Sequence, residues 1–565
     1  MRMRRWLSVL WSVLLCVSLT ACASIPTSGP VEEGKAQPED QQQGVRYFPQ
    51  GPTDGASREE IVQGFLDAGT GTRDGFRAAK EFLTPEARQS WDPNERVLIM
   101  SGQASMKSQG KTGIEVSVPL LGSVDRHGLY SETLSNSNEQ LDFELVEIDG
   151  QWRISKLPQG IVLAKQPFTD LFSKQTLTFF DSAKRYTSPD LRWLPNGDSL
   201  PTRIVNELIE GPAEWMRPGS AVVTAFPSDV SLVQSVDVVD GVAAVDFNDR
   251  LSASMGPTEL SLAKLQLEES LLAVPGISSV ELRVNGARLD VGLPERNEVV
   301  TTADVSTLPL VQAGDRFGFL NTDEVSAPDG ADNVVNAVKS YNPIRGAMSA
   351  SRQTMTMLNA TGTYAMSFQD TEPTLIDERA GQVEPALDNW DWVWTQSTTE
   401  TGLYVTHIGD YEMHEVELPG QVSAGFISHQ VSRDGTRLAV LFTDNEGVKL
   451  AVMPILREDG SPEGLGSPLI VAMPGVNDRA SDLAWIDENS IGMLVNKSDG
   501  STSVRLYRVG GELTSMGTIP SAAQVAGSNS LTGMRIVDRH GTVYAPRGSR
   551  WQALGTTITF LYAQV

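Results

Sequence analysis

The residue best suited to covalent chemistry near the start of the chain is Cys22. It directly follows an apolar run, Trp6–Ala21, and that run follows the basic stretch Arg2–Arg5. The 565-residue chain has two cysteines, and the other one, Cys16, lies inside the apolar run. If the run is removed, the chain keeps a single thiol, which cannot form an internal disulfide. The chemistry open to Cys22 is therefore its modification by an external group.

The apolar run has the features of an export signal. A membrane-spanning helix needs about 20 apolar residues, whereas this run is shorter, has a cationic front and ends in small residues. The order Leu19-Thr20-Ala21-Cys22 resembles the lipobox of bacterial lipoproteins, in which the cysteine is acylated and becomes the mature N-terminus. We therefore predict a signal peptide at 1–21 and lipidation, including palmitate, at Cys22. The alternatives are an ordinary signal peptide cleaved nearby and a buried, unpaired cysteine.

Composition predicts how the rest of the chain relates to the membrane. Residues 22–56 are rich in Pro, Gly and polar residues such as "EDQQQG", so they cannot bury enough surface to fold and are predicted to form a flexible tether. No later apolar run approaches spanning length. The net charge of −26 argues against nucleic acid as a partner. We expect a protein held by lipid on the extracytoplasmic face of the cell membrane.

The residues that could bind metal follow no known metal-site pattern. His407, His414 and His429 match no common zinc spacing. Asp246 and Asp249 could hold a cation, but no Ca²⁺-loop motif surrounds them, so capping of a strand end and its turn is favoured. A G-x-S-x-G motif is absent as well. We therefore predict no catalytic residue, no metal site, no cofactor and no enzymatic activity.

Three tryptophans form the main candidate contact surface. Trp390, Trp392 and Trp394 alternate along the chain, so two or all three could share one face of a strand. Packing between sheets is the favoured reason for this pattern. The alternative is an aromatic platform that contacts a partner or a glycan ring.

The segment 57–168 shows helical signals first and strand signals afterwards. Ser57-Arg58-Glu59-Glu60 is a capping box, and Thr84-Pro85 marks the start of a later helix. The stretch "FELVEIDGQWRIS" predicts a hairpin that turns at Asp149-Gly150. This order resembles the nuclear-transport-factor-2-like (NTF2-like) fold, so we predict an α+β domain. Its only histidine, His127, has no evident acid or base partner, and a structural or docking role is favoured.

The segment 172–294 alternates helices with strand pairs, which predicts an α/β layer structure. Two amphipathic stretches, "LPTRIVNELIEGPAE" and "PTELSLAKLQLEESLLAV", predict its helices, and Asp240-Gly241 and Asn285-Gly286 predict hairpin turns. The run Leu208–Pro212, together with Gly241–Phe247, resembles the GerMN domain of spore-germination and envelope lipoproteins. That resemblance implies binding rather than catalysis.

The segment 298–565 has no helical period and repeats short strand-like runs. Their centres are Gly318, Ala365, Trp394, Val440, Met493 and Tyr544. Five intervals separate them: 47, 29, 46, 53 and 51 residues. A period near 40–50 residues with several strands per unit is typical of a β-propeller. We predict an all-β propeller-like domain, with a β-sandwich as the competing architecture.

Taken together, the acylated start "CASIPTSGPV", the NTF2-like region, the GerMN domain and the propeller resemble the LpqB lipoproteins of actinobacteria over essentially the whole chain. This resemblance implies an accessory protein outside the cytoplasmic membrane. It also implies association with the extracytoplasmic domain of a sensor histidine kinase of the Mtr two-component system, and through it an influence on cell-wall homeostasis and division. The alternative is an envelope lipoprotein that binds peptidoglycan or another wall glycan.

Overall fold

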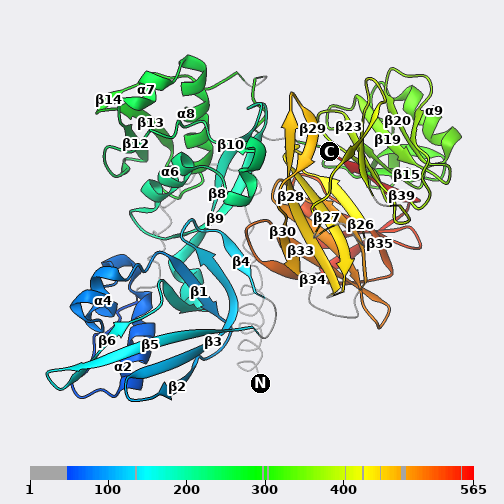
Figure 1. Ribbon diagram of the computed structural model, residues 1–565. Helices are drawn as coiled ribbons and strands as arrows, with labels where there is room; N and C mark the ends of the chain where they lie inside the picture. The colour runs from blue at the N-terminus through cyan, green and yellow to red at the C-terminus, as the bar shows by residue number, and fades with distance from the viewer. Residues whose placement is uncertain are drawn as a thin grey trace, which may run out of the picture. The chain divides into compact units, whose positions relative to one another are not determined.

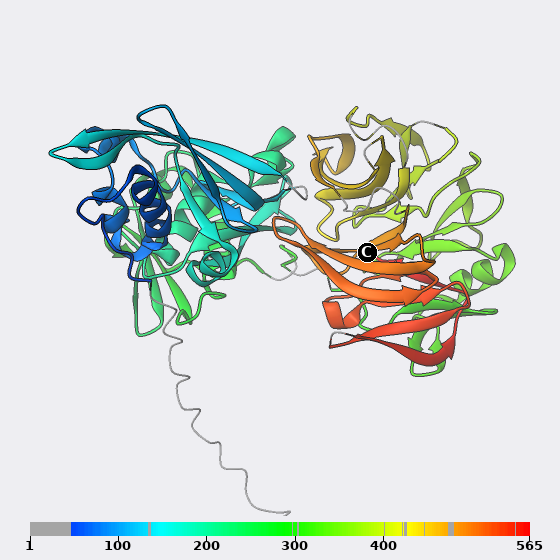
Figure 2. The same ribbon diagram turned by 90° about the horizontal axis from the view of Figure 1, so that it is seen from below.

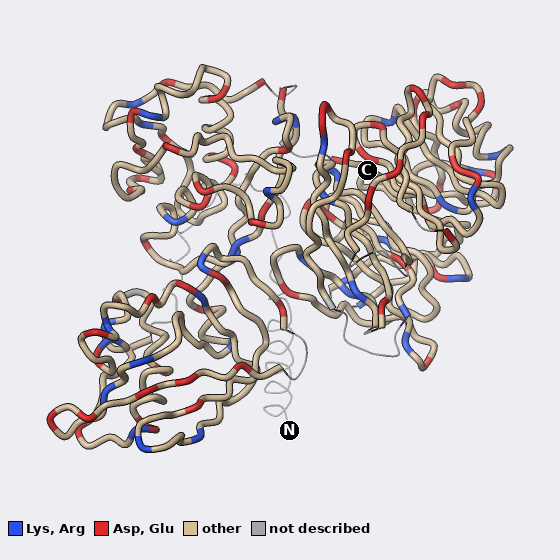
Figure 3. The backbone as a smooth tube through the Cα atoms, in the orientation of Figure 1, with Lys and Arg blue, Asp and Glu red and all other residues tan. Residues whose placement is uncertain are grey.

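The computed structural model describes residues 47–565 except 134–136, 296–297, 302–303, 401, 421, 423–425, 446, 473–478 and 549. The predicted signal peptide, Cys22 and most of the predicted tether lie outside the described residues. Tyr47–Val565 forms one compact unit. Within the described part of the chain, no helix has both the length and the apolar character needed to span a membrane. Figure 3 shows acidic and basic residues interspersed along that part.

The first domain begins with short helices that are fixed by local capping. Its helical elements are α2 (Arg58–Asp67), η1 (Ala68–Thr70), η2 (Thr72–Asp74), α3 (Arg77–Glu81) and α4 (Pro85–Ser90). The capping box of Ser57 and Glu60 is confirmed, because each side chain bonds the backbone of the other residue. Thr84 also caps α4 as predicted, with its hydroxyl accepting a bond from the Ala87 amide at 3.2 Å.

A bent sheet completes the first domain (Figure 1). Its strands are β1 (Arg96–Met100), β2 (Ser105–Gln109), β3 (Gly113–Asp125), β4 (Tyr130–Glu132), β5 (Asn138–Ile148), β6 (Gln151–Lys156) and β7 (Ile161–Ala164). The first half of β3 pairs with β2 and β5, and its second half pairs with β1 and β4. Helix α2 buries Ile61, Val62 and Phe65 in the core beneath this sheet. The predicted α+β composition is confirmed.

The second domain has two small sheets and five helical segments after the linking helix α5 (Lys165–Leu171). Its strands are β8 (Phe172–Asp181), β9 (Thr187–Pro195), β10 (Val222–Val223), β11 (Asp237–Val239), β12 (Val242–Phe247), β13 (Ser279–Val284) and β14 (Ala287–Arg288). Its helices are α6 (Leu200–Glu210), α7 (Arg250–Ser254) and α8 (Pro257–Leu271), and the short η3 (Glu214–Met216) and η4 (Pro218–Ser220) follow α6. Helix α8 contacts α6, β8 and β13 (Figure 1).

The three predicted Asx-Gly hairpin turns are confirmed. Asp149-Gly150 joins β5 to β6, Asp240-Gly241 joins β11 to β12, and Asn285-Gly286 joins β13 to β14. Both residues of each turn have positive φ, between 48° and 81°. This backbone twist matches the twist of the flanking strands, and Asn, Asp and Gly tolerate it best.

The described part of the third domain consists of six blades, of which the fourth has five strands and the others have four. The first two blades form one continuous sheet, with strands β15 (Leu310–Ala313), β16 (Arg316–Asn321), β17 (Glu324–Ser326), β39 (Phe560–Gln564), β18 (Arg345–Met348), β19 (Thr354–Leu358), β20 (Thr363–Ser367) and β21 (Thr374–Asp377). The third blade comprises β22 (Ala386–Leu387), β23 (Trp392–Gln396), β24 (Leu403–His407) and β25 (Met413–Val416). Helix α9 (Asp332–Tyr341) lies between the first two blades in sequence and is an exception to the predicted lack of helix.

The remaining blades follow in chain order. The fourth blade comprises β26 (Phe426–Val431), β27 (Arg437–Asp444), β28 (Gly447–Glu458), β29 (Ser461–Leu465) and β30 (Leu469–Ala472). The fifth comprises β31 (Arg479–Trp485), β32 (Ser490–Asn496), β33 (Ser501–Arg508) and β34 (Leu513–Pro520). The sixth comprises β35 (Ala522–Ala526), β36 (Arg535–Asp538), β37 (Thr542–Arg547) and β38 (Arg550–Thr557), with η5 (Leu531–Gly533) before β36.

The blades form a ring that the final strand closes. The innermost strands of successive blades contact one another, and Figure 2 shows the sheets arranged around a common centre. Strand β39 pairs antiparallel with β15 and parallel with β18, so it supplies the innermost strand of the first blade. The predicted propeller is confirmed and the competing sandwich is wrong, because successive sheets neighbour one another around a ring instead of forming two facing layers.

Candidate functional site

The tryptophan row does not form one surface. Trp394 is fully buried, and its indole Nε1 donates a hydrogen bond of 3.0 Å to Oδ2 of Asp388. The same carboxylate oxygen accepts a bond of 2.6 Å from Nη2 of Arg457. Trp394 is therefore a core residue of the third blade, and its proposed role in a partner or glycan contact is corrected. Burial leaves the ring no face on which a sugar could stack.

The other two tryptophans contact different parts of the molecule. Trp390 lies in the turn before β23, where its ring is 6.1 Å from the Tyr186 ring of the GerMN-like second domain and Arg185 lies over it at 5.1 Å. Trp392 begins β23, and its ring centre is 5.0 Å from His407 and 6.2 Å from His414. Both side chains are half-buried. The alternation predicted a common face, but only Trp392 and Trp394 belong to the strand.

The predicted cation candidates have structural roles where the structure describes them. Asp246 is buried, and its Oδ1 accepts a bond of 2.9 Å from the Gly286 amide, so it caps the turn between β13 and β14, not the turn after its own strand. Asp249 makes no side-chain capping bond to α7. His429 is buried on the innermost strand of the fourth blade, with Nε2 3.2 Å from the Trp394 carbonyl oxygen. Burial lowers the pKa of His429 to about 4. His407 and His414 flank Trp392 and do not meet His429.

Two carboxyls near the inner strands of the propeller were missed by sequence reasoning: Glu384, whose side chain is 17% exposed, and Asp482, which is 5% exposed. Glu384, just before β22, accepts from Nε2 of Gln524 at 3.3 Å and lies 3.3 Å from Nε of Arg345. Asp482 on β31 accepts from the Val525 amide at 2.8 Å. Burial raises the pKa of both carboxyls, and the charge of Asp482 raises that of Glu384 further. Arg345 opposes both shifts.

The second domain and the propeller meet through polar side chains that are buried. Strand β9 lies against the turn Ser432–Arg437 between β26 and β27, where Oγ of Ser188 and Oγ1 of Thr436 are 3.0 Å apart. Arg437 is 1% exposed and donates to the Pro189 carbonyl at 3.4 Å. It also donates to Oδ2 of Asp434 at 3.0 Å and to the Glu488 carbonyl at 2.8 Å. One buried guanidinium therefore joins two blades to the second domain.

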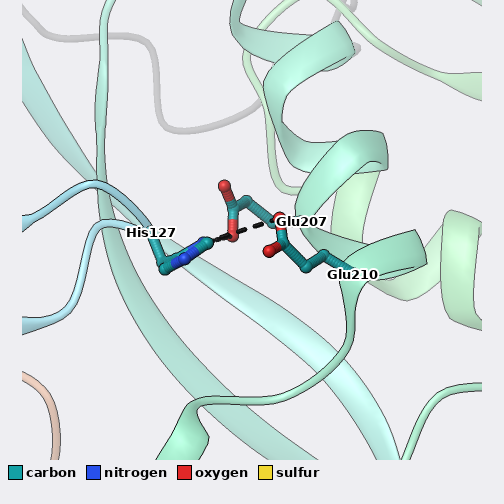
Figure 4. Close-up of side chains that lie close together, drawn as sticks. All are labelled: His127, Glu207 and Glu210. Carbon is teal, nitrogen blue, oxygen red and sulfur yellow. Dashed lines mark hydrogen bonds and ion pairs between the residues drawn. The ribbon is translucent and has the colours of Figure 1, made fainter. Parts of the chain in front are cut away.

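A histidine and two glutamates converge where the first domain meets the second (Figure 4). His127 lies between β3 and β4, and Glu207 and Glu210 lie one turn apart at the end of α6. Nδ1 of His127 is 3.3 Å from Oε2 of Glu207 and 3.6 Å from Oε2 of Glu210. Among the described residues, this is the one group of three or more His, Cys, Asp or Glu side chains with converging ligand atoms. The expectation that His127 lacks an acidic partner is wrong.

A buried ion pair positions this group. Arg192 on β9 binds Asp190 through two nitrogens, at 2.7 and 3.0 Å. The third guanidinium nitrogen of Arg192, Nη1, does not bind Asp190. It donates to the His127 carbonyl at 2.7 Å and lies 3.5 Å from Oε2 of Glu207. Burial raises the pKa of Glu207, while the charge of Arg192 opposes that shift. One arginine thus fixes both the loop of His127 and the carboxylate that faces it.

A cavity of about 150 Å³ adjoins the group. Glu207, Arg203 and Trp193 are among the residues that line it. Nε of Arg203 and Nε1 of Trp193 are buried and have no hydrogen-bond partner among the described residues. Two unsatisfied N–H donors therefore belong to residues that line the same cavity as Glu207, a costly arrangement unless water or a ligand accepts from them.

Family models match three consecutive parts of the chain. The model for the N-terminal domain of lipoprotein LpqB matches residues 51–169. The model described as sporulation and spore germination matches residues 176–290, and the model for the lipoprotein LpqB beta-propeller domain matches residues 325–559. The GerMN-like and propeller domains described above thus coincide with matched regions.

Similar proteins extend over most of the chain. A lipoprotein LpqB of Thermobifida fusca is 25% identical, and the match covers 92% of this chain and 91% of that protein. A lipoprotein LpqB of Bifidobacterium longum is 30% identical, with coverage of 60% of this chain and 64% of that protein. Among solved structures, the first GerMN domain of the sporulation protein GerM from Bacillus subtilis is 22% identical with a TM-score of 0.18, covering 22% of this chain and 96% of that one.

The two LpqB-specific models flank the spore-germination match, and curated relatives that bear the same name match the chain from its first domain to its propeller. The chain therefore belongs to the LpqB lipoprotein family.

Proposed function

We propose that this lipoprotein binds the extracytoplasmic domain of a sensor histidine kinase of the Mtr type and thereby modulates two-component signalling in cell-wall homeostasis and division. The proposal starts from membership of the LpqB family. The structural observation that supports it is the buried contact between β9 and the propeller, made by Ser188 with Thr436 and by Arg437 with Pro189 and Glu488. This contact holds the second domain and the propeller together, so that they can bind a partner as one unit. The protein acts by binding and not by catalysis.

A lipid on Cys22 makes weak contacts sufficient. Attachment to the membrane that also carries the kinase raises the local concentration of the lipoprotein, so its binding to the kinase ectodomain becomes effectively intramolecular. The lipoprotein shifts the kinase between its states only if it binds one state more tightly than the other. The mechanism therefore requires an anchored body with differential affinity, and no chemical step.

In-cell crosslinking followed by capture of the kinase tests the proposal. The native chain should enrich the kinase, and a Cys22→Ser variant should lose that enrichment in cells while both purified chains bind the isolated kinase ectodomain equally. Absence of the kinase from the native capture would overturn the proposal. Equal enrichment by Cys22→Ser in cells would instead contradict the role of the anchor.

Substitutions on the propeller can locate the contact. Three large apolar side chains on outer strands of successive blades are exposed, at 40%, 47% and 39%: Leu375, Met413 and Ile470. Replacing them together with serine should weaken capture of the ectodomain if the propeller makes the contact. Val233, Val238 and Val239 in the second domain are exposed too and provide the matched control.

The alternative is binding of an envelope glycan, for which Trp390 and Trp392 remain partly exposed while Trp394 is buried. Sedimentation of the purified chain with wall material distinguishes the two functions. Kinase capture without sedimentation supports the signalling role. Sedimentation that Trp392→Ala abolishes would favour the glycan.

A further inference from the structure

The His127, Glu207 and Glu210 group has the spacing of metal ligands. Its Nδ1–Oε2 separations are 3.3 and 3.6 Å. A tetrahedral Zn²⁺ with bonds of roughly 2.0–2.2 Å holds its ligand atoms roughly 3.3–3.5 Å apart. Direct charge-assisted hydrogen bonds between such groups are shorter, about 2.7–2.9 Å. The observed distances are longer than those of such charge-assisted bonds and are close to the separation of ligand atoms around one ion.

The charges around the group leave room for a divalent cation. Arg192 is already neutralised by the two-nitrogen contact with Asp190, and its distance to Glu207 is longer, at 3.5 Å. Two carboxylates, Glu207 and Glu210, then face a histidine that is neutral as a metal ligand. Two further cations line the adjoining cavity. Arg126 lies 3.9 Å from Glu95, and Arg203 makes no ion pair within 4 Å among the described residues. A doubly charged ion would balance the two carboxylates.

The elements that carry the three ligands are suited to a preorganised site. Glu207 and Glu210 are three positions apart on α6, so they share one helix face. The His127 loop is held by its amide, which donates to Oδ1 of Asp125 at 2.9 Å, and by its carbonyl, which accepts from Arg192 at 2.7 Å. Such outer contacts orient metal ligands in known sites.

The adjoining cavity, which Glu207 alone of the three residues lines, contains donors without a partner among the described residues. Trp193 is 4% exposed and lines the cavity together with Glu207, and its Nε1 has no partner in the described structure. Nε of Arg203 is also unpartnered there. A water or small anion bound to the ion could accept a hydrogen bond from these donors. This observation is independent of the ligand distances and indicates an occupant with acceptor atoms.

We propose that His127, Glu207 and Glu210 bind one Zn²⁺-type cation that joins the β3–β4 loop of the first domain to helix α6 of the second. The nitrogen ligand excludes Mg²⁺ and Ca²⁺ as preferred occupants, since both favour all-oxygen sites. The ion is a structural link between two domains, separate from any contact with a kinase.

Equilibrium dialysis of the native chain against Zn²⁺, with metal content measured by mass spectrometry, tests the proposal. One Zn²⁺ per chain should be retained in the presence of excess Mg²⁺. Glu210→Gln and His127→Gln should each weaken retention at least tenfold. Both side chains are partly exposed, at 52% and 30%, so circular dichroism should show an unchanged fold.

Matched controls separate this site from adventitious binding. Glu214→Gln removes an exposed carboxylate just beyond α6, and His414→Gln removes an exposed histidine of the propeller. Both should retain Zn²⁺ like the native chain. Substitution by Co²⁺ should give the visible absorption of a tetrahedral site in the native chain and lose it in Glu210→Gln. No retained Zn²⁺, or equal retention by the Glu210 and His127 variants, overturns the proposal.

Discussion

The hydroxyl oxygens of Ser188 and Thr436 lie 3.0 Å apart although 248 residues separate them in the chain. Both residues are buried, one on β9 of the second domain and the other in the turn that opens β27 of the propeller. Their contact places the neighbouring Arg437 under the carbonyl of Pro189. The strength of the domain contact therefore depends on a few enclosed polar groups.

Replacing Arg437 with methionine should destabilise this contact strongly. The change leaves Asp434 as a buried, unpaired carboxylate and removes donors from the carbonyls of Glu488 and Pro189. Breaking a buried pair by removing one partner costs about 3–5 kcal/mol. Denaturant unfolding followed by tryptophan fluorescence measures the loss. The exposed Arg550→Met is the control and should change the free energy of unfolding by less than about 0.5 kcal/mol.

Asp388→Asn should weaken the third blade. Its carboxylate accepts from Nη2 of Arg457 and from Nε1 of Trp394, and the side chain of Arg457 is 5% exposed. Loss of the charge leaves that guanidinium unpaired, at a cost of about 3–5 kcal/mol. Chemical denaturation compares it with Asp323→Asn, an exposed turn residue. Equal stability of the two variants would contradict the role assigned to Asp388.

Stability should fall in mild acid because of His429. Its pKa is lowered by burial from 6.5 in the unfolded chain to about 4 in the folded protein. Between these values the unfolded chain binds a proton that the folded chain does not, so the free energy of unfolding decreases as the pH drops. The full loss is about 3 kcal/mol at 1.36 kcal/mol per pKa unit. His429→Gln should remove this slope between pH 7 and 4.5, whereas the exposed His414→Gln should keep it.

Glu384 should produce the opposite dependence. Burial and the charge of Asp482 raise the pKa of Glu384 above its usual 4.5, so the folded chain holds a proton that the unfolded chain has released. Stability is then greatest below pH 4.5 and decreases as the pH rises through the raised pKa. Glu384→Gln should reduce the decrease between pH 5 and 8 by at least about 1.4 kcal/mol, one pKa unit. Thermal unfolding at both pH values measures it, with Glu412→Gln as an exposed control.

Local signals in the sequence predicted most of the elements. Asp149-Gly150, Asp240-Gly241 and Asn285-Gly286 sit at turns because their backbone conformation depends on a few neighbouring residues. Ser57 caps a helix for the same reason. The six strand runs found in the last segment each belong to a different blade. The short interval of 29 residues arises because Ala365 lies on the third strand of its blade and Trp394 on the second strand of the next.

Contacts between distant segments were not predictable in this way. His127 and Glu207 are 80 positions apart, and only the docking of β3–β4 against α6 brings them together. No spacing rule links a loop histidine to a Glu-x-x-Glu pair on another domain. For Trp394 the favoured prediction of packing agrees with its burial, and the alternative of a contact surface does not. Alternation predicts which residues share a face of a strand, but whether another sheet covers that face depends on the neighbouring blades.

The closure of the ring by β39 determines when the propeller can become complete. A chain is made from its first residue onward, and β39 follows every other blade strand. Until that segment emerges, β15 and β18 each expose an unpaired strand edge, and such edges readily pair with other chains. The nascent domain is thus open to mispairing until β39 has been made, and a protein that shields those two edges would protect it.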